Sequence, residues 1–176
     1  YEFKPWQSLF KIDKGRNKKT NDLIPQERII IDEDGKEINL DKFGIGPIIF
    51  DLIIFELSSH IFSFVNTEKT SIKNYLRDNG GVRVYRDGVR VYDYGESDND
   101  WLGLEQKRIS RFAGKISNNM VIGSANISRA ESLILKEKSN REGFIQNESF
   151  YAFKSAVNYA LNLIVRERNV DREILN

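Results

Sequence analysis

Residues 82–94 read VRVYRDGVRVYDY and contain the clearest local structural signal in the chain. Asp87 and Gly88 form one of the preferred two-residue turns of a β-hairpin. Counting outward from this turn predicts three cross-strand pairs: Val84 with Val91, Tyr85 with Arg90, and Arg83 with Tyr92. The hairpin decides the fold, because its register determines which side chains face the core.

The two faces of the predicted hairpin differ in character. One face carries valines, which we expect to be buried: Val82, Val84 and Val91. The other face carries aromatic and basic side chains, which we expect to be more exposed: Tyr85, Arg90 and Tyr92. Such Arg and Tyr side chains can stack on nucleic-acid bases, but they can also pair with each other across the strands. Cross-strand pairing is the simpler interpretation because it needs no ligand.

The segments around the hairpin alternate between strand and helix patterns. Residues 27–40 predict a second hairpin, with a turn at Asp34-Gly35. The apolar run 48–59 predicts a long strand that is covered on both faces for much of its length. We expect a helix from Asn66 or Thr67 to Gly80, a short helix over 104–112, a strand over 119–128 and a loop over 129–146.

The last predicted element is a helix from about Glu148 to Arg168, with Asn147 as its N-cap. An apolar stripe repeats at helical spacing along it: Phe150, Phe153, Val157, Leu161 and Ile164. We expect this stripe to pack on a sheet. The order of elements therefore predicts an α/β two-layer sandwich, in which a mostly antiparallel sheet is backed by helices on one face.

Composition excludes several classes of function. The 176 residues include 27 Lys and Arg against 26 Asp and Glu, a balance that argues against a general polyanion binder. Cysteine is absent and His60 is the single histidine, so we expect no metal site. His60 lies in the apolar run SSHIFSFV and is interpreted as a packed or half-exposed strand residue. The apolar stretch 45–65 carries Asp51, Glu56 and His60, which favours a core segment over a membrane span.

Two charged segments remain as candidate binding sites. The first is the arm 1–27, where five basic residues cluster: Lys11, Lys14, Arg16, Lys18 and Lys19. Such a run can contact phosphate, but it is more often a solvated loop. The second is the loop KEKSNREGFIQNESF, residues 136–150, which places Lys138, Arg141 and Glu142 just ahead of the last helix. An arginine in that position can present its guanidinium to an anion outside the domain.

Three stretches together resemble a known superfamily. They are NGGVRVYRDGVRVYDYGESDNDWLGLE (79–105), NNMVIGSANISR (118–129) and SNREGFIQNESF (139–150). Their succession is similar to the segment that follows the ATP-binding domain in bacterial GHKL-type ATPases, a superfamily that contains gyrase B, the ninety-kilodalton heat-shock chaperones, MutL and the Microrchidia proteins. SNREGF resembles the S-R-E stretch of the chaperones and the N-K-Q-D-F stretch of the Microrchidia proteins. The resemblance covers about residues 45–168.

The resemblance implies a transducer domain, the second domain of such ATPases. Its fold is shared with the second domain of a small-subunit ribosomal protein, a four-stranded sheet backed by helices. In that superfamily the transducer sends one basic residue to the γ-phosphate of ATP bound in the neighbouring domain. The matching position is Arg141, which is thereby the expected catalytic residue, with Asn140 and Lys138 as further ATP-binding residues and Glu142 flanking the turn.

The chain departs from the superfamily in lacking its ATP-binding signatures. An acidic residue and an Asn one helical turn apart, then D-x-G-x-G and a Gly-rich lid, are not found. We therefore expect a fragment, since it also begins at Tyr1 without Met. Residues 1–27 would end a missing ATP-binding domain and 28–176 would form the transducer. The fragment alone would be inactive and hold no cofactor, whereas its parent would hydrolyse ATP, with Mg²⁺, in the cytoplasm.

Two rival functions stay open at this point. One is a nucleic-acid-binding module that uses the basic arm and the Arg/Tyr face of the hairpin. It predicts tight binding that weakens steeply with salt. The other is a protein-interaction domain with no link to nucleotides. The expected partner is the upstream ATP-binding domain of the same chain; a second copy and a nucleic acid are left open, and no membrane partner is expected.

Overall fold

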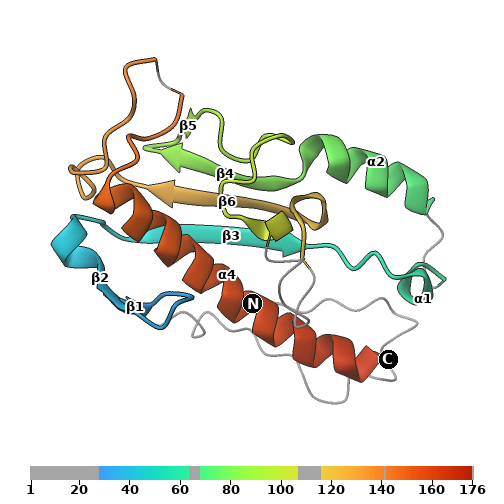
Figure 1. Cartoon of the computed structure of the whole chain (residues 1–176). Helices are drawn as coiled ribbons and strands as arrows, with labels where there is room; N and C mark the ends of the chain where they lie inside the picture. Colours follow the sequence, from blue (N-terminus) through green and yellow to red (C-terminus); the bar gives the residue numbers. More distant parts are fainter. Residues whose placement is uncertain (1–27, 64–67, 107–115, 141, 176) are drawn as a thin grey trace.

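The computed structural model describes residues 28–63, 68–106, 116–140 and 142–175. Its strands are β1 (Ile29–Ile31), β2 (Glu37–Asn39), β3 (Ile48–Ile54), β4 (Gly81–Arg86), β5 (Val89–Val91) and β6 (Val121–Ile127). Its helices are α1 (Ser59–Phe62), α2 (Lys69–Asn79) and α4 (Glu148–Leu175), with short 3₁₀ turns η2 (Leu40–Phe43) and η3 (Asn118–Met120). The result is the predicted α/β two-layer sandwich (Figure 1).

A four-stranded sheet in the order β3-β6-β4-β5 forms one layer, and the long helix α4 lies across it as the other (Figure 1). β6 pairs antiparallel with β3 and parallel with β4, while β4 and β5 form an antiparallel hairpin. β1 and β2 form a separate two-stranded sheet. The predicted hairpin in 27–40 is thereby confirmed, with Gly35 at a positive φ of 80° in its turn.

The register predicted for the 82–94 hairpin is confirmed at its core. Val84 pairs with Val91 and Tyr85 with Arg90, and the three valines are buried. The third predicted pair does not form. The ladder ends at Val91, and Tyr92 makes a bridge to Glu142 in the loop ahead of α4 instead of pairing with Arg83. A neighbouring loop thus replaces the strand partner that counting alone assigned.

The prediction that strand 48–59 is covered on both faces is wrong. β3 ends at Ile54 and is an edge strand. Its side chains alternate between half-buried and exposed, with Ile49 67% and Ile53 60% exposed on the face opposite α4. A run of apolar residues does not by itself distinguish a buried central strand from an edge strand with one open face.

His60 does not lie on a strand. It belongs to the short helix α1 and is exposed, so the interpretation as a packed or half-exposed strand histidine is also wrong. The chain leaves the sheet at Phe55, whose N–H donates to the Met120 carbonyl, and among the described residues, 56–63 pair with no strand. Helix α2 ends at Asn79 as expected, while its predicted start at Asn66 or Thr67 lies outside the described residues.

Helix α4 supplies most of the apolar layer over the sheet. Asn147 caps it as predicted, because its side-chain oxygen accepts a hydrogen bond from the Phe150 N–H at 3.0 Å. Four residues of the predicted stripe are buried: Phe150, Phe153, Val157 and Leu161. The helix runs to Leu175, beyond the predicted end at Arg168, because a polar sequence without Gly or Pro does not stop a helix.

Candidate functional site

Residues 136–145 form a narrow loop between β6 and α4. The Ile145 N–H donates to the Lys136 carbonyl at 2.8 Å, and the Lys138 N–H donates to the Gly143 carbonyl at 2.9 Å. Glu137 and Phe144 form an antiparallel bridge between these bonds. The chain therefore enters and leaves the loop through a two-sided neck, and the described residues at its tip are Ser139, Asn140 and Glu142.

The tip is a tight turn held by its own side chains. The Asn140 side chain donates to a carboxylate oxygen of Glu142 at 2.8 Å and accepts from the Glu142 N–H at 3.1 Å. Gly143 follows with φ of 78°, and a Cβ there would lie 2.9 Å from the Tyr94 hydroxyl oxygen. The backbone at the base of the tip is thus pressed against the rest of the domain, and glycine permits it.

Two of the three predicted ATP-binding residues can be placed. Lys138 and Asn140 are exposed; Lys138 lies in the neck of the loop and Asn140 lies at its tip. Arg141, the residue expected to reach the γ-phosphate, lies outside the described residues. The expectation that it presents its guanidinium to an anion outside the domain therefore stays a prediction. Its two neighbours, Asn140 and Glu142, are joined by the side-chain bonds just described.

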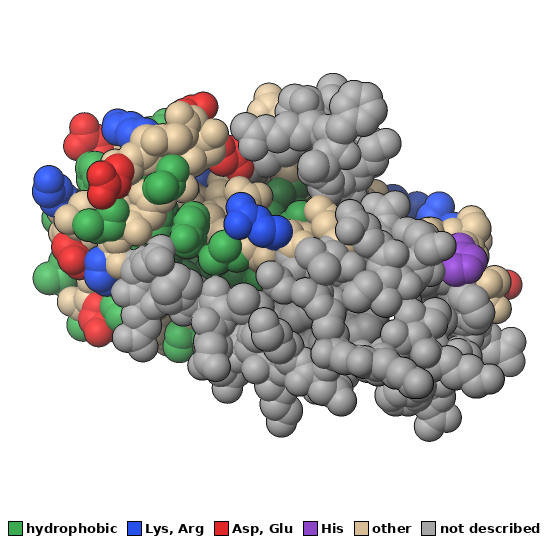
Figure 2. Space-filling model, turned by 90° about the horizontal axis from the view of Figure 1, so that it is seen from below, with side chains coloured by type: hydrophobic (Ala, Val, Ile, Leu, Met, Phe, Trp, Pro, Cys, Tyr) green, Lys and Arg blue, Asp and Glu red, His purple; other side chains and the backbone are tan. Residues whose placement is uncertain are grey.

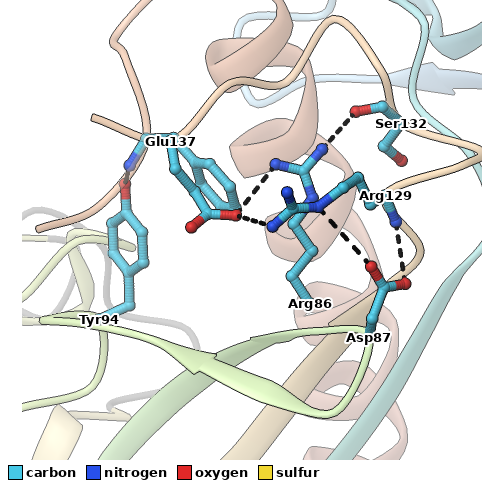
Figure 3. Close-up of polar contacts among 7 residues, drawn as sticks. Arg86, Asp87, Tyr94, Arg129, Ser132 and Glu137 are labelled. Atoms are coloured by element: carbon cyan, nitrogen blue, oxygen red, sulfur yellow. Dashed lines mark hydrogen bonds and ion pairs between the residues drawn. The ribbon is translucent and has the colours of Figure 1, made fainter. Parts of the chain in front are cut away.

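The neck of the loop is tied to the sheet by a charged cluster that sequence reasoning missed (Figure 3). One carboxylate oxygen of Glu137 accepts from Arg86 at 3.2 Å and from Arg129 at 3.3 Å. Arg86 also donates to the Ser132 carbonyl at 3.0 Å. Asp87, in the hairpin turn, accepts from the Arg129 N–H at 3.1 Å. These contacts join the hairpin, the segment after β6 and the loop.

A signal for this cluster is present in the sequence. Arg86 has the same parity along β4 as Val82 and Val84, so strand alternation directs it to the core face. A buried guanidinium needs a counterion, which predicts a nearby carboxylate. Arg86 is only 6% exposed and lies 5.8 Å from the centre of the Phe144 ring. Which acid meets it could not be predicted, because Glu137 is 51 positions further along the chain.

A second tie is made by Tyr94, another residue that sequence reasoning missed. Its hydroxyl oxygen accepts a hydrogen bond from the buried Phe144 N–H at 2.8 Å (Figure 3). Its ring packs against Trp101, Phe144 and Phe150, with centroids 5.0–6.0 Å apart. Burial raises the pKa of the Tyr94 phenol, and the Phe144 N–H offsets this only in part. The phenol therefore stays neutral in the folded state at physiological pH.

Replacing Tyr94 by phenylalanine is expected to destabilise the fold by about 1–3 kcal/mol, because it leaves the buried Phe144 N–H without an acceptor. Tyr85→Phe, on the half-exposed opposite face, is the matched control and should change little.

The raised pKa of the Tyr94 phenol adds a second readout, the dependence of stability on pH. Stability should fall as the pH rises above about 10, where an unfolded tyrosine ionises, and this part of the fall should vanish in Tyr94→Phe. Chemical denaturation of each variant across pH measures both effects; equal losses in Tyr94→Phe and Tyr85→Phe would contradict the role of the hydroxyl.

The Arg/Tyr face of the hairpin is only partly available to a ligand. Tyr85 and Arg90 lie opposite each other and are half-buried. Arg90 forms an ion pair with Glu96, and Arg83 donates to the Asn79 carbonyl at 3.2 Å. Both guanidinium groups thus have partners in their own chain. The basic arm 1–27 lies outside the described residues.

Asp100, in the segment ESDNDW (residues 96–101), has a local structural role. Asp100 accepts hydrogen bonds from the N–H groups of Leu104 and Glu105 at 2.8 and 2.9 Å, so it caps the start of the turn that follows. Most of the predicted helix 104–112 lies outside the described residues. In the described part of the chain, no three acidic or histidine side chains are grouped so as to hold a metal ion.

The surface of the described residues mixes charges with apolar groups. Figure 2 shows basic, acidic and hydrophobic side chains mixed together over the described residues at one end of the molecule. Among the helices of the described ranges, none has both the length and the apolar character required to cross a membrane. No protein-family model, curated protein or solved structure matches the chain. The function must therefore be argued from the residues themselves.

Proposed function

We propose that the chain is the transducer domain of a GHKL-type ATPase and that loop 136–145 carries Arg141 to the γ-phosphate of ATP. The observation that carries the proposal is the loop itself. Lys138 in its neck and Asn140 at its tip are both exposed, while the neck is bonded to the sheet directly ahead of α4. A charged tip on a fixed base suits a group that must reach an anion on another domain. The motif SNREGF, with its resemblance to that superfamily, supplies the identity of the anion.

Arg141 would act through its charge and its shape. A guanidinium donates two parallel hydrogen bonds to phosphate oxygens, so it distinguishes a terminal phosphate from its absence. Asn140 and Lys138 would bind the same phosphate chain from the limb of the loop that precedes Arg141. ATP and its Mg²⁺ would be held mainly by an upstream domain of the same protein, in the cytoplasm. Hydrolysis would remove the contact and release the two domains to rotate.

The test is the Arg141→Ala variant of the protein that joins this domain to its ATP-binding domain. Turnover should fall about 100-fold, the loss typical of removing one donor that stabilises developing charge. Nucleotide affinity should change little, because the contact is made in the closed state. Arg141→Lys should lose less, since it keeps the charge but not the paired geometry.

Arg77→Ala is the control, because Arg77 is an exposed arginine on α2 whose ion pair with Asp78 lies within that helix. It should keep the turnover of the wild type. Steady-state hydrolysis measured beside nucleotide affinity separates the variants. Wild-type turnover in Arg141→Ala would end the proposal.

A second candidate is nucleic-acid binding by the hairpin face. It is favoured by Tyr85 and Arg90, which lie opposite each other on the face not covered by α4. The ion pair between Arg90 and Glu96 weighs against it, because it neutralises the cation that would meet phosphate. Binding of a single-stranded oligonucleotide that weakens steeply with salt would favour this candidate over the transducer.

A further inference from the structure

Glu137 is the point at which the loop and the sheet are joined. Its backbone forms the bridge to Phe144 in the neck of the loop, and its carboxylate holds Arg86 of β4 and Arg129 (Figure 3). The next residue, Lys138, already belongs to the exposed part of the loop. Any shift of the Glu137 side chain is therefore transmitted directly to the residues that lead to the tip.

Arg86 is a demanding partner for this carboxylate. It is buried at the end of β4, and two of its nitrogens are used by Glu137 and the Ser132 carbonyl. Its Nε is buried and has no hydrogen-bond partner among the described residues. A pair with an unsatisfied buried nitrogen is a poor source of stability, and apolar side chains of similar size often serve as well.

What the pair does provide is a fixed orientation of the Glu137 carboxylate. The planar guanidinium of Arg86 can donate to a carboxylate from only a few directions, and it is itself held between the Phe144 ring and the Ser132 carbonyl. Arg129 restrains the same carboxylate oxygen from a second side and is tied by its N–H to Asp87 in the hairpin turn. The orientation of Glu137 is thus set by two cations from two segments.

We propose that Glu137, held by Arg86 and Arg129, is the positioning residue that fixes the loop 136–145 relative to the sheet. This inference rests on the proposed function, in which Arg141 at the tip of that loop contacts phosphate. Misplacing a reacting or recognising group by about 1 Å can cost roughly 100-fold in rate. The two-cation clamp would prevent such a displacement.

The experiment compares Glu137→Gln with a matched control elsewhere in the domain. Glu56 pairs with Arg168 at 2.6 Å, and its side chain is 23% exposed against 25% for Glu137. Glu56→Gln therefore removes a similar charge from a similar pair away from the loop. The first readout is hydrogen exchange at the Lys138 and Ile145 amides, whose bonds define the neck. The second is ATP turnover, beside nucleotide affinity, in the protein that carries the ATP-binding domain.

Glu137→Gln should speed exchange at these two amides about tenfold over the wild type, because it loosens the neck without global unfolding. It should lower turnover about 10- to 100-fold with nucleotide affinity unchanged. Glu56→Gln should leave both the exchange and the turnover unchanged. Arg86→Lys keeps the positive charge but loses the planar geometry of the guanidinium, so it should change exchange and turnover in the same direction as Glu137→Gln but by less. If Glu137→Gln does not fold, Arg86→Lys serves as the test variant.

The inference is overturned if Glu137→Gln matches Glu56→Gln in both exchange and turnover while Arg141→Ala still loses turnover. The proposed function would then stand without it. If Arg141→Ala keeps wild-type turnover, the proposed function fails instead. In that case the hydrogen-exchange rate at the Lys138 and Ile145 amides alone decides whether Glu137 fixes the loop. A rate in Glu137→Gln equal to that of the wild type would refute this role.

Discussion

Replacing Phe153 by alanine is expected to lower the free energy of unfolding by about 3–5 kcal/mol, the range for truncating a fully buried aromatic side chain. Phe153 is fully buried in α4. Its ring stacks on Trp101 with centroids 5.8 Å apart and meets the edge of Phe144 at 5.9 Å. Alanine would leave a cavity between the helix, the sheet and the base of loop 136–145, which the fixed rings around it could not fill.

Urea denaturation of Phe153→Ala beside Tyr151→Ala measures this cost. Tyr151 is an aromatic residue on the same helix, two positions away and exposed, so its truncation should cost well under 1 kcal/mol. A loss below about 1 kcal/mol in Phe153→Ala, far from the expected range, would mean that α4 does not rely on the sheet for its packing and docks elsewhere.

Replacing Gly95 by alanine is expected to cost about 2–5 kcal/mol, the sum of a left-handed backbone strain and an overpacking term. Gly95 has φ of 76°, and a Cβ there would lie 2.6 Å from the carbonyl carbon and oxygen of Val82. Those are backbone atoms at the start of β4, which is bonded to β6, so they cannot move aside as a side chain could.

Gly88→Ala separates the two contributions. Gly88 has nearly the same φ, 79°, but no atom lies within 4 Å of the Cβ position. It should show the backbone strain alone, about 1–2 kcal/mol. Thermal or urea unfolding of both variants gives the difference, which we assign to the close approach of the two backbones. Equal losses in Gly88→Ala and Gly95→Ala would refute that assignment.

The parts of the fold that could be predicted were those with a strong local period. The alternation around Asp87-Gly88 determined the Val84–Val91 pair, and the helical stripe placed Phe153 in the core. The open face of β3 could not be predicted in this way. Ile49 and Ile53 are as apolar as a buried strand requires, and they are exposed because they lie on the face of the sheet opposite α4.

In the candidate site, too, the local features could be predicted from the sequence and the long-range contacts could not. Loop 136–145 was found through its charged residues and its resemblance to a known motif, both of which are local. Its ties to the sheet join residues far apart in sequence: Arg86 with Glu137, and Tyr94 with Phe144. A single sequence indicates that Arg86 needs a partner, but only tertiary structure selects Glu137 among the many acids.

The order of the strands has a consequence for how the chain reaches its native state. β6 lies between β3 and β4, although it follows both in sequence, and its Val121 pairs with Ile54 of β3. During synthesis the β4–β5 hairpin can close within about 1–10 μs of leaving the ribosome. The edges of β3 and β4 that pair with β6 stay unpaired until β6 has been synthesised. Contacts so distant in sequence slow folding, and exposed edges invite association between chains. A nascent chain held on a ribosome that pauses before Val121 should therefore depend on chaperones until its central strand is synthesised.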